Sequence, residues 1–304
     1  TMRRRRTAGA ACWCAVLVLG SCGAAQAEPI EVDAAAVEQV FARWDGDDCP
    51  GGAVGVIVDG ELVYARGFGM ANLDYGVRNT PATLFRIAST SKQFTAACAM
   101  LLAVAGELDL DAEIQTLLPE IPKYEWPVTV RQMIEHTSGV RDYLELHQWA
   151  GAREHDWFTP EESLALVARQ QGLMFEPGTE FSYSNSNYFL LAEIVKRVSG
   201  KTLREYAEAE IFGTLGMERS HFHDRHDEVT VGRATGYAPD GDGWRVLNTQ
   251  LDHVGDGGVF TSVEELVKWD ANFYANRLSG GERFLELMLD DAFQTSDTPT
   301  YYAA

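Results

Sequence analysis

The sequence is poor in basic residues. Its 304 residues include 25 Lys and Arg against 45 Asp and Glu, a formal net charge of −20. A protein that binds nucleic acid needs a basic face to neutralise phosphates, and an acidic face repels them. The same charge argues against docking on anionic lipid headgroups through a basic surface. The composition therefore argues against nucleic acid as a partner.

Cysteine is also scarce, and three of the five cysteines lie in the first 27 residues. No Cys/His spacing is typical of a structural zinc site, so we expect no metal and no other cofactor. Of the remaining two, Cys98 lies in an apolar run and is expected to be a small buried side chain. A Cys49–Cys98 disulfide is the alternative in an oxidising compartment. A chain of this length buries enough surface, roughly 75%, to be stable without a disulfide scaffold.

Long hydrophobic runs are missing too. The apolar run at residues 10–19 has ten residues, whereas a transmembrane helix needs about 20. It follows four arginines, which is typical of a secretory signal peptide. We therefore interpret residues 1–27 as a signal peptide and expect a periplasmic or secreted protein. Cleavage after the Ala-Gln-Ala sequence would start the chain at Glu28, whereas a lipobox-like Leu-Gly-Ser-Cys would lipidate Cys22 and give a membrane-anchored lipoprotein.

The chain after the leader is predicted to begin with a helix and a hairpin. Residues 33–44 carry apolar side chains at helical spacing. Residues 53–58 and 61–65 predict two strands, and the Asp59-Gly60 pair between them tolerates the positive φ of a tight turn.

The rest of the pattern is almost wholly helical. Residues 94–105 are apolar on every side, which predicts a buried helix that ends at Gly106. A capping box of Ser262 and Glu265 starts the last helix. We expect further strands only after residue 290. The helix candidates after residue 106 are 128–137, 159–171, 187–199, 202–212 and this last one, 262–276.

A Ser-x-x-Lys motif, Ser89 to Lys92, lies at the start of the buried helix. Serine is a poor nucleophile unless a neighbour takes its proton. Residues three apart on a helix share a face, and the free N–H groups of a helix start favour developing negative charge. The motif alone is common by chance, and an N-cap serine beside a solvated lysine is the alternative.

A second candidate element is Tyr183-Ser184-Asn185, in a polar loop that follows Pro177-Gly178 and precedes a predicted helix. Loops of this kind present side chains on a rigid scaffold. A tyrosine and a carboxamide two residues apart can face one cleft. The alternative is a Ser/Asn-rich turn with aromatic anchors.

Together these stretches resemble the serine β-lactamase and penicillin-binding protein superfamily, most closely its class C and esterase-like branch. The matching segments are residues 85–94, 136–139 and 177–188, and the likeness runs from about residue 35 to 276. The resemblance implies an α/β (α+β) fold of the β-lactamase/DD-peptidase type, in which an antiparallel sheet flanked by helices adjoins a large helical region. It divides the β-lactamase-related domain, 28–304, into a first α/β part (28–88), a mainly helical part (89–260) and a return to the α/β part (261–304).

The resemblance also implies roles for four residues. Ser89 is the acylated nucleophile, Lys92 its partner, and Tyr183 the general base that also protonates the leaving group. Asn185 holds the acyl side chain of the substrate. Unperturbed Lys and Tyr have pKa values of ~10.4 and ~10. To accept a proton near neutral pH, each therefore needs the electrostatic field of the other in a site partly shielded from water. The implied substrate is a β-lactam, a D-amino-acid peptide or an ester, small or derived from peptidoglycan, and residues 136–139 are expected to shape the cleft wall.

One family motif has no match. The family carries Lys or His, a small residue and Gly on a strand beside the nucleophile. His253-Val254-Gly255 fits this pattern, but we reject it because a capped helix follows it that in the family precedes the third motif. We expect the third motif and the closing strands beyond residue 304, so that the chain as it stands is truncated and impaired.

Two rival functions remain open at this point. One is a non-catalytic peptidoglycan- or partner-binding protein on the same fold, which the missing motif favours. The other is a metallo-hydrolase that uses the histidines of residues 221–227, although this stretch lacks the ligand order of such enzymes and is expected to be an exposed charged loop. Residues 240–243, Asp-Gly-Asp-Gly, lack the closing Glu of a calcium loop and are expected to form a turn.

Overall fold

The computed structural model describes residues 31–153, 156–249, 251–289, 293–294 and 301–302. The predicted signal peptide and Cys22 lie outside these residues. None of the helices in the described part of the chain has the length and apolarity that a membrane span requires.

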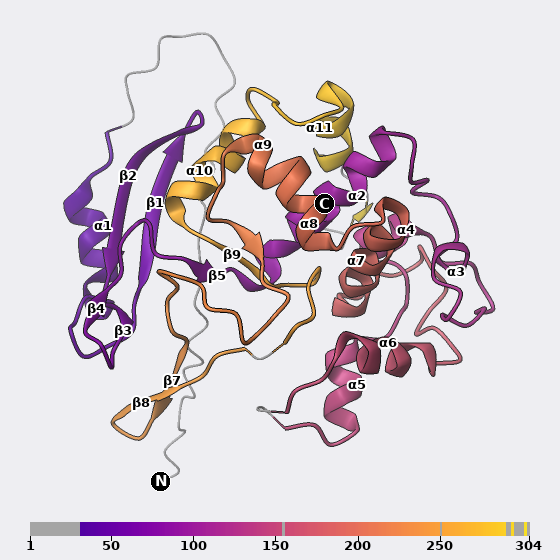
Figure 1. Cartoon of the computed structure of the whole chain (residues 1–304), viewed down its shortest axis with the longest axis horizontal. Helices are drawn as coiled ribbons and strands as arrows, with labels where there is room; N and C mark the ends of the chain where they lie inside the picture. Colours follow the sequence, from indigo (N-terminus) through magenta and orange to yellow (C-terminus); the bar gives the residue numbers. More distant parts are fainter. Residues whose placement is uncertain (1–30, 154–155, 250, 290–292, 295–300, 303–304) are drawn as a thin grey trace.

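The predicted hairpin is present and has a helix on either side (Figure 1). Strand β1 (Gly52–Val58) pairs antiparallel with β2 (Glu61–Phe68), and Asp59 and Gly60 have φ values of 51° and 79°. Helix α1 (Ala34–Phe41) packs against one face, where the ring centroid of Phe41 lies 5.2 Å from that of Phe68. Helix α10 (Val263–Asn272) approaches the other face so closely that a Cβ on Gly55 would meet Val263. Residues 53–65 and 33–44 are therefore confirmed as hairpin and helix.

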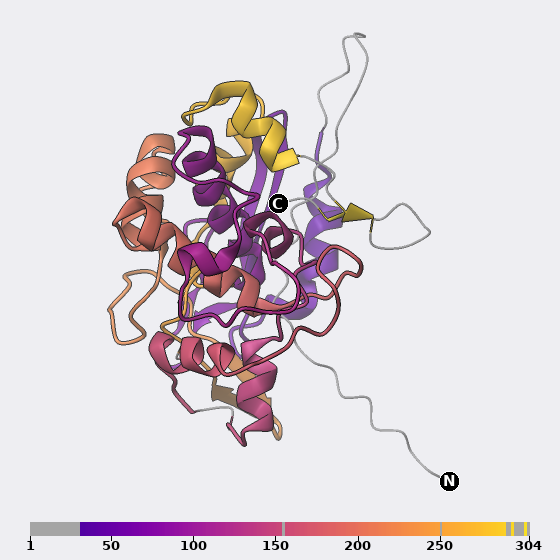
Figure 2. The same cartoon turned by 90° about the vertical axis from the view of Figure 1, so that its right-hand side faces the viewer.

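The helical region is built around α2 (Lys92–Val104), which is buried along most of its length. Its side chains are apolar on every side, so it has no solvent face and neighbouring helices surround it. It packs on α7 (Asn185–Ser199), and Figure 2 looks onto this region with the hairpin behind it. The other helices here are α3 (Ile114–Leu117), α4 (Val130–Ile134), α5 (Tyr143–Trp149), α6 (Pro160–Ala168), α8 (Leu203–Ala207), α9 (Gly213–Leu215) and α11 (Gly281–Leu289).

The expectation that no further strand occurs before residue 290 is wrong. The chain between α9 and α10 forms β6 (His221–Phe222), β7 (Tyr237–Asp240), β8 (Gly243–Val246) and β9 (Val259–Thr261). Two to four residues are too few for apolar alternation to be visible in the sequence. The predicted turn at residues 240–243 is confirmed, since it joins β7 to β8.

Strand β9 is central to a small sheet of order β5-β9-β6, which lies between the hairpin and the helical region. Its other member, β5 (Phe85–Arg86), directly precedes the predicted nucleophile turn. The remaining short pairs are β3 (Met70–Asn72) with β4 (Val77–Arg78), and β10 (Phe293–Gln294) with β11 (Tyr301–Tyr302).

Several helix ends differ from the prediction. The segment 202–212 divides into α8 and a π-helical turn, Glu208–Phe212. Ser262 caps α10 by accepting a hydrogen bond from the Glu265 backbone N–H (3.3 Å). The Glu265 carboxylate does not complete the predicted capping box, because it accepts hydrogen bonds from Lys268 and the Arg219 backbone instead. Both described cysteines are free thiols, so the alternative Cys49–Cys98 disulfide is not formed.

Candidate active site

The turn that carries Ser89 is fixed by β9. It is a 3₁₀ turn, Ala88–Ser91, that runs directly into α2. The Ile87 N–H donates to the Val259 carbonyl (3.0 Å), and the Val259 N–H donates to Ser91 Oγ (3.0 Å). Ala88 has a φ of 47°, a left-handed conformation that costs an L-residue roughly 1–2 kcal/mol. The surrounding hydrogen bonds maintain this strained turn, which leaves Ser89 exposed at the helix start.

The structure brings together the three predicted catalytic side chains. Ser89 Oγ lies 2.8 Å from the Tyr183 hydroxyl and 3.3 Å from Lys92 Nζ. Lys92 is 3% exposed, and Tyr183 is 42% exposed. The serine is therefore open to solvent on one side while its lysine partner is buried beneath it.

The environment of this group changes its proton affinities. Burial lowers the pKa of Lys92 to about 8, although the carboxylates of Asp256 and Asp142 act in the opposite direction. Burial raises the pKa of Tyr183, and its hydrogen bond to Ser89 offsets part of that rise. Lys92 is thus the member of the group that titrates nearest to neutral pH, where a proton acceptor is most effective.

The fourth predicted residue, Asn185, also lies in this group. Its Oδ1 accepts a hydrogen bond from Lys92 Nζ (3.0 Å). Its Nδ2 donates to Asp142 Oδ2 (2.7 Å). The predicted contact of Asn185 with a substrate acyl side chain stays a prediction.

Two buried carboxylates of the site were missed by the sequence analysis. Asp142 lies 43 residues before Asn185, and the only local signal for it is that of a helix N-cap before Tyr143. Asp256 accepts a hydrogen bond from the Tyr143 hydroxyl (2.9 Å), and its backbone carbonyl accepts one from Lys92 Nζ (2.6 Å). Burial raises the pKa of Asp256, whereas the positive charge of Lys92 lowers it.

The segment 136–139 lies behind Tyr183, and its expected role in shaping the cleft wall stays a prediction. His136, Thr137 and Ser138 are fully buried. The His136 ring centroid is 4.4 Å from that of Tyr183, and its Nδ1 accepts a hydrogen bond from the Ser184 N–H (3.1 Å). The segment therefore supports the tyrosine from inside the protein.

This burial makes His136 a source of acid sensitivity. Burial lowers its pKa to about 3, so the unfolded chain, with a histidine pKa of ~6.5, takes up the proton first as the pH falls. The stability that His136 contributes is present above about pH 6.5 and is lost progressively toward pH 3. The loss amounts to about 2 kcal/mol at pH 5, which is 1.5 pH units below 6.5.

We expect urea unfolding to show this fall between pH 7 and pH 5, and His136→Asn to reduce it. Asparagine tolerates the left-handed backbone of residue 136, whose φ is 58°. An unchanged pH dependence in the variant would contradict the assignment to His136.

His253 does not belong to the nucleophile group. It is 1% exposed, its Nε2 lies 2.6 Å from Ser163 Oγ, and its ring stacks on that of Tyr143 at 5.1 Å. The rejection of residues 253–255 as the third motif stays a prediction. The location of that motif stays a prediction.

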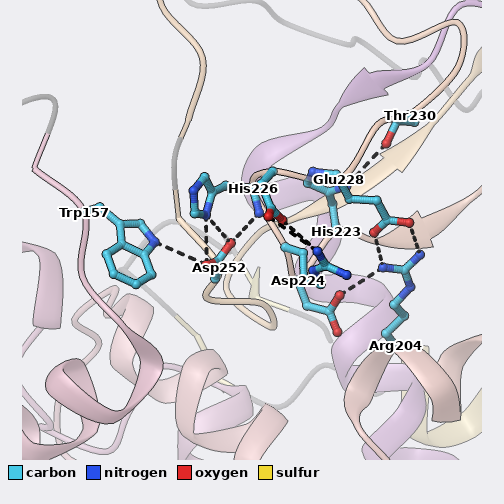
Figure 3. Close-up of polar contacts among 10 residues, drawn as sticks. Trp157, Arg204, His223, Asp224, His226, Glu228, Thr230 and Asp252 are labelled. Atoms are coloured by element: carbon cyan, nitrogen blue, oxygen red, sulfur yellow. Dashed lines mark hydrogen bonds and ion pairs between the residues drawn. The ribbon is translucent and has the colours of Figure 1, made fainter.

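The histidine-rich stretch 221–227 is engaged in polar contacts within the protein (Figure 3). The expectation of an exposed loop is only partly right, since His223 is 5% exposed. His226 Nδ1 lies 3.0 Å from Asp252, which also accepts a hydrogen bond from Trp157 Nε1 (3.2 Å). Further pairs join Arg204 to Asp224 and Glu228. Across the described ranges, no group of three His, Cys, Asp or Glu side chains could hold a metal ion.

The fold, with a serine at the start of a buried helix and a lysine one turn on, is that of the serine β-lactamase and penicillin-binding protein superfamily. The chain belongs to the Beta-lactamase family, whose model matches residues 37–303. The predicted family and fold class are thereby confirmed.

Relatives and solved structures give a finer comparison. A D-aminopeptidase from Gluconobacter oxydans (strain 621H) is 32% identical over 237 residues, which cover 78% of this chain and 44% of that enzyme. The octameric penicillin-binding protein homologue from Pyrococcus abyssi is 29% identical, with a TM-score of 0.77 over 90% of this chain and 64% of that one. A D-amino acid amidase from Ochrobactrum anthropi SV3 is 27% identical, with a TM-score of 0.63 over 76% and 65%. The chain thus spans less than half the length of the D-aminopeptidase.

Proposed function

We propose that this protein is a serine hydrolase that forms an acyl-enzyme on Ser89 and cleaves the amide bond of a D-amino-acid amide or peptide. The observation that carries the proposal is the position of Ser89 Oγ within hydrogen-bonding reach of both Tyr183 and Lys92. The names of the D-aminopeptidase and D-amino acid amidase relatives support the substrate class. A reactive ester or a β-lactam offers the same carbonyl to the same serine.

In the proposed reaction the Lys92–Tyr183 pair first holds one proton fewer, as a neutral Lys92 amine or a Tyr183 phenolate. Ser89 Oγ then bonds to the substrate carbonyl carbon, and its proton passes to that vacant position of the pair. The C–N bond then breaks, and the Tyr183 hydroxyl gives a proton to the departing amine. Water attacks the resulting ester, the pair accepts the water's proton, and Ser89 regains its own. The Tyr183 hydroxyl oxygen and Lys92 Nζ both lie within hydrogen-bonding reach of Ser89 Oγ, so whichever of the two has lost its proton can take the serine proton directly.

The substrate assignment is tested with matched chromogenic compounds. We expect D-alanine p-nitroanilide to be cleaved faster than its L enantiomer. p-Nitrophenyl acetate and nitrocefin are assayed in parallel to measure cleavage of an ester and of a β-lactam. Faster cleavage of the L enantiomer would overturn the substrate class. Absence of turnover of all four compounds would overturn the proposed activity.

We also propose that the protein works in the periplasm or is secreted, on the basis of the arginines and the apolar run within residues 1–27. N-terminal sequencing and mass spectrometry of the mature protein distinguish a chain that begins at Glu28 from one lipidated at Cys22. A mature protein that retains residues 1–27 in the cytoplasm would contradict export.

Hydrolysis is expected to persist after exhaustive EDTA treatment. Ser89 supplies the nucleophile that a zinc-bound water supplies in a metallo-hydrolase. The measurement is turnover of p-nitrophenyl acetate before and after chelation. Activity that disappears with EDTA and returns with zinc would favour the metallo-hydrolase alternative instead.

A further inference from the structure

Asp142 joins a helix cap to the active site. One carboxylate oxygen, Oδ1, accepts hydrogen bonds from the backbone N–H groups of Leu144 (2.8 Å) and Glu145 (3.2 Å) at the start of α5. The other, Oδ2, accepts from the backbone N–H and from Nδ2 of Asn185 (2.6 Å and 2.7 Å). A carboxylate has about four acceptor positions, so this side chain, 7% exposed, is fully occupied within the protein.

The carboxylate determines which way the Asn185 amide faces. Because Nδ2 donates to Asp142, the carbonyl oxygen Oδ1 faces Lys92 Nζ at 3.0 Å. The flipped amide would place its NH₂ group against an ammonium and its oxygen against a carboxylate, two repulsive contacts. The hydrogen-bond network therefore permits a single orientation.

Asn185 in turn fixes the position of Lys92. An ammonium group has three donors. Here one donates to Asn185 Oδ1 (3.0 Å), one to the backbone carbonyl of Asp256 (2.6 Å) and one to Ser89 Oγ (3.3 Å). The first two contacts determine where the third one points.

We propose that Asp142 is a positioning residue of the reaction, which through the Asn185 amide directs Lys92 Nζ at Ser89. This inference rests on the proposed function of Ser89 as the nucleophile. The hydrogen bonds of the Asp142 carboxylate go to Asn185 and to the start of α5, so it acts on Ser89 through its neighbours.

The charge of Asp142 also acts on Lys92. Burial lowers the pKa of this lysine, and Asp256 and Asp142 raise it. Replacement of Asp142 by a neutral residue removes one of these two charges, so the pKa of Lys92 falls further. The charged and titratable groups that face Lys92 from the surrounding elements are Arg86, His136, Asp142, Tyr183, Tyr188 and Asp256.

The test is Asp142→Asn in the full-length protein. Asparagine is as good an N-cap as aspartate, so its oxygen can keep the start of α5. The charge is then lost, and its NH₂ group faces the two Asn185 donors that Asp142 Oδ2 accepts, so both of those hydrogen bonds are lost. Asp33→Asn is the matched control, because Asp33 caps α1 through the Ala36 N–H in the same way but has no contact with the site. We expect Asp142→Asn to lower kcat for p-nitrophenyl acetate by about 10²-fold, the usual cost of misplacing a reacting group, with KM little changed.

The pH profile separates positioning from a structural role. In the profile of kcat against pH, the part that reports deprotonation of Lys92 is expected to move to lower pH in Asp142→Asn. Loss of a helix cap alone would lower kcat at every pH and leave the position of the profile unchanged. Asn185→Ala keeps the Asp142 carboxylate and its hydrogen bonds to the start of α5, so it is the second variant to use if Asp142→Asn does not fold. Because Asp142 acts through Asn185, the double variant should lose much less in kcat than the product of the two single losses.

Wild-type kcat and an unmoved pH profile in Asp142→Asn would overturn the inference, as would wild-type kcat in Asn185→Ala. Fluorophosphonate labelling of the wild type distinguishes this failure from failure of the proposed function. If Ser89 is labelled in the wild type and Asp142→Asn has wild-type kcat and pH profile, only the proposed role of Asp142 is overturned. An unlabelled Ser89 removes the nucleophile itself, and the inference with it.

Discussion

Replacement of Ser89 by alanine is expected to lower turnover of p-nitrophenyl acetate by about 10⁴–10⁶-fold, the scale seen when a hydrolase loses its nucleophile. Tyr183 and Lys92 both lie within hydrogen-bonding distance of the Ser89 hydroxyl, and without that oxygen neither has a group to act on. Residual activity would come from binding and electrostatics alone.

The same experiment has a direct chemical measurement. Peptide mass spectrometry after incubation with a fluorophosphonate or penicillin should place the adduct on Ser89. Thr90→Ala is the matched control, because it removes the neighbouring exposed hydroxyl and should leave the adduct in place. An adduct that survives in Ser89→Ala, or that maps to another serine, contradicts the assignment.

Tyr183→Phe and Lys92→Ala are each expected to lower turnover by about 10²–10⁴-fold, which is what general acid–base catalysis contributes. The phenylalanine variant keeps the ring that packs on His136 and removes only the hydroxyl 2.8 Å from Ser89. The folded state should therefore persist while proton transfer is lost.

The two residues are expected to behave as one unit. Lys92 Nζ lies 4.8 Å from the centre of the Tyr183 ring, so the double variant should cost much less than the product of the single losses. Tyr206→Phe, on α8, is the matched control for removal of a tyrosine hydroxyl and should leave turnover unchanged. Near-normal turnover in Tyr183→Phe would show that this tyrosine is not the base.

The sequence by itself determined the local features. Ser89 and Lys92 lie one helical turn apart, so their proximity needs only the helix that the apolar run after them predicts. The hairpin turn needs positive φ at Asp59 and Gly60, and that dipeptide tolerates it. Tyr183 and Asn185 were predicted from the resemblance carried by segments 85–94, 136–139 and 177–188. A motif match can be read from a sequence, whereas the distance between residues far apart in the chain cannot.

The tertiary structure decided what depends on contacts between distant segments. Strand β9 has three residues, too few to show alternation, and it exists because β5 and β6 pair with it on either side. Asp142 has the sequence signature of an N-cap, and only the packing of α5 beside α7 places it on Asn185. Asp256 is a charged residue that the sequence would place in solvent. It lies buried beneath the site because Tyr143, Arg86 and Lys92 provide the hydrogen bond and the positive charges that a buried carboxylate requires.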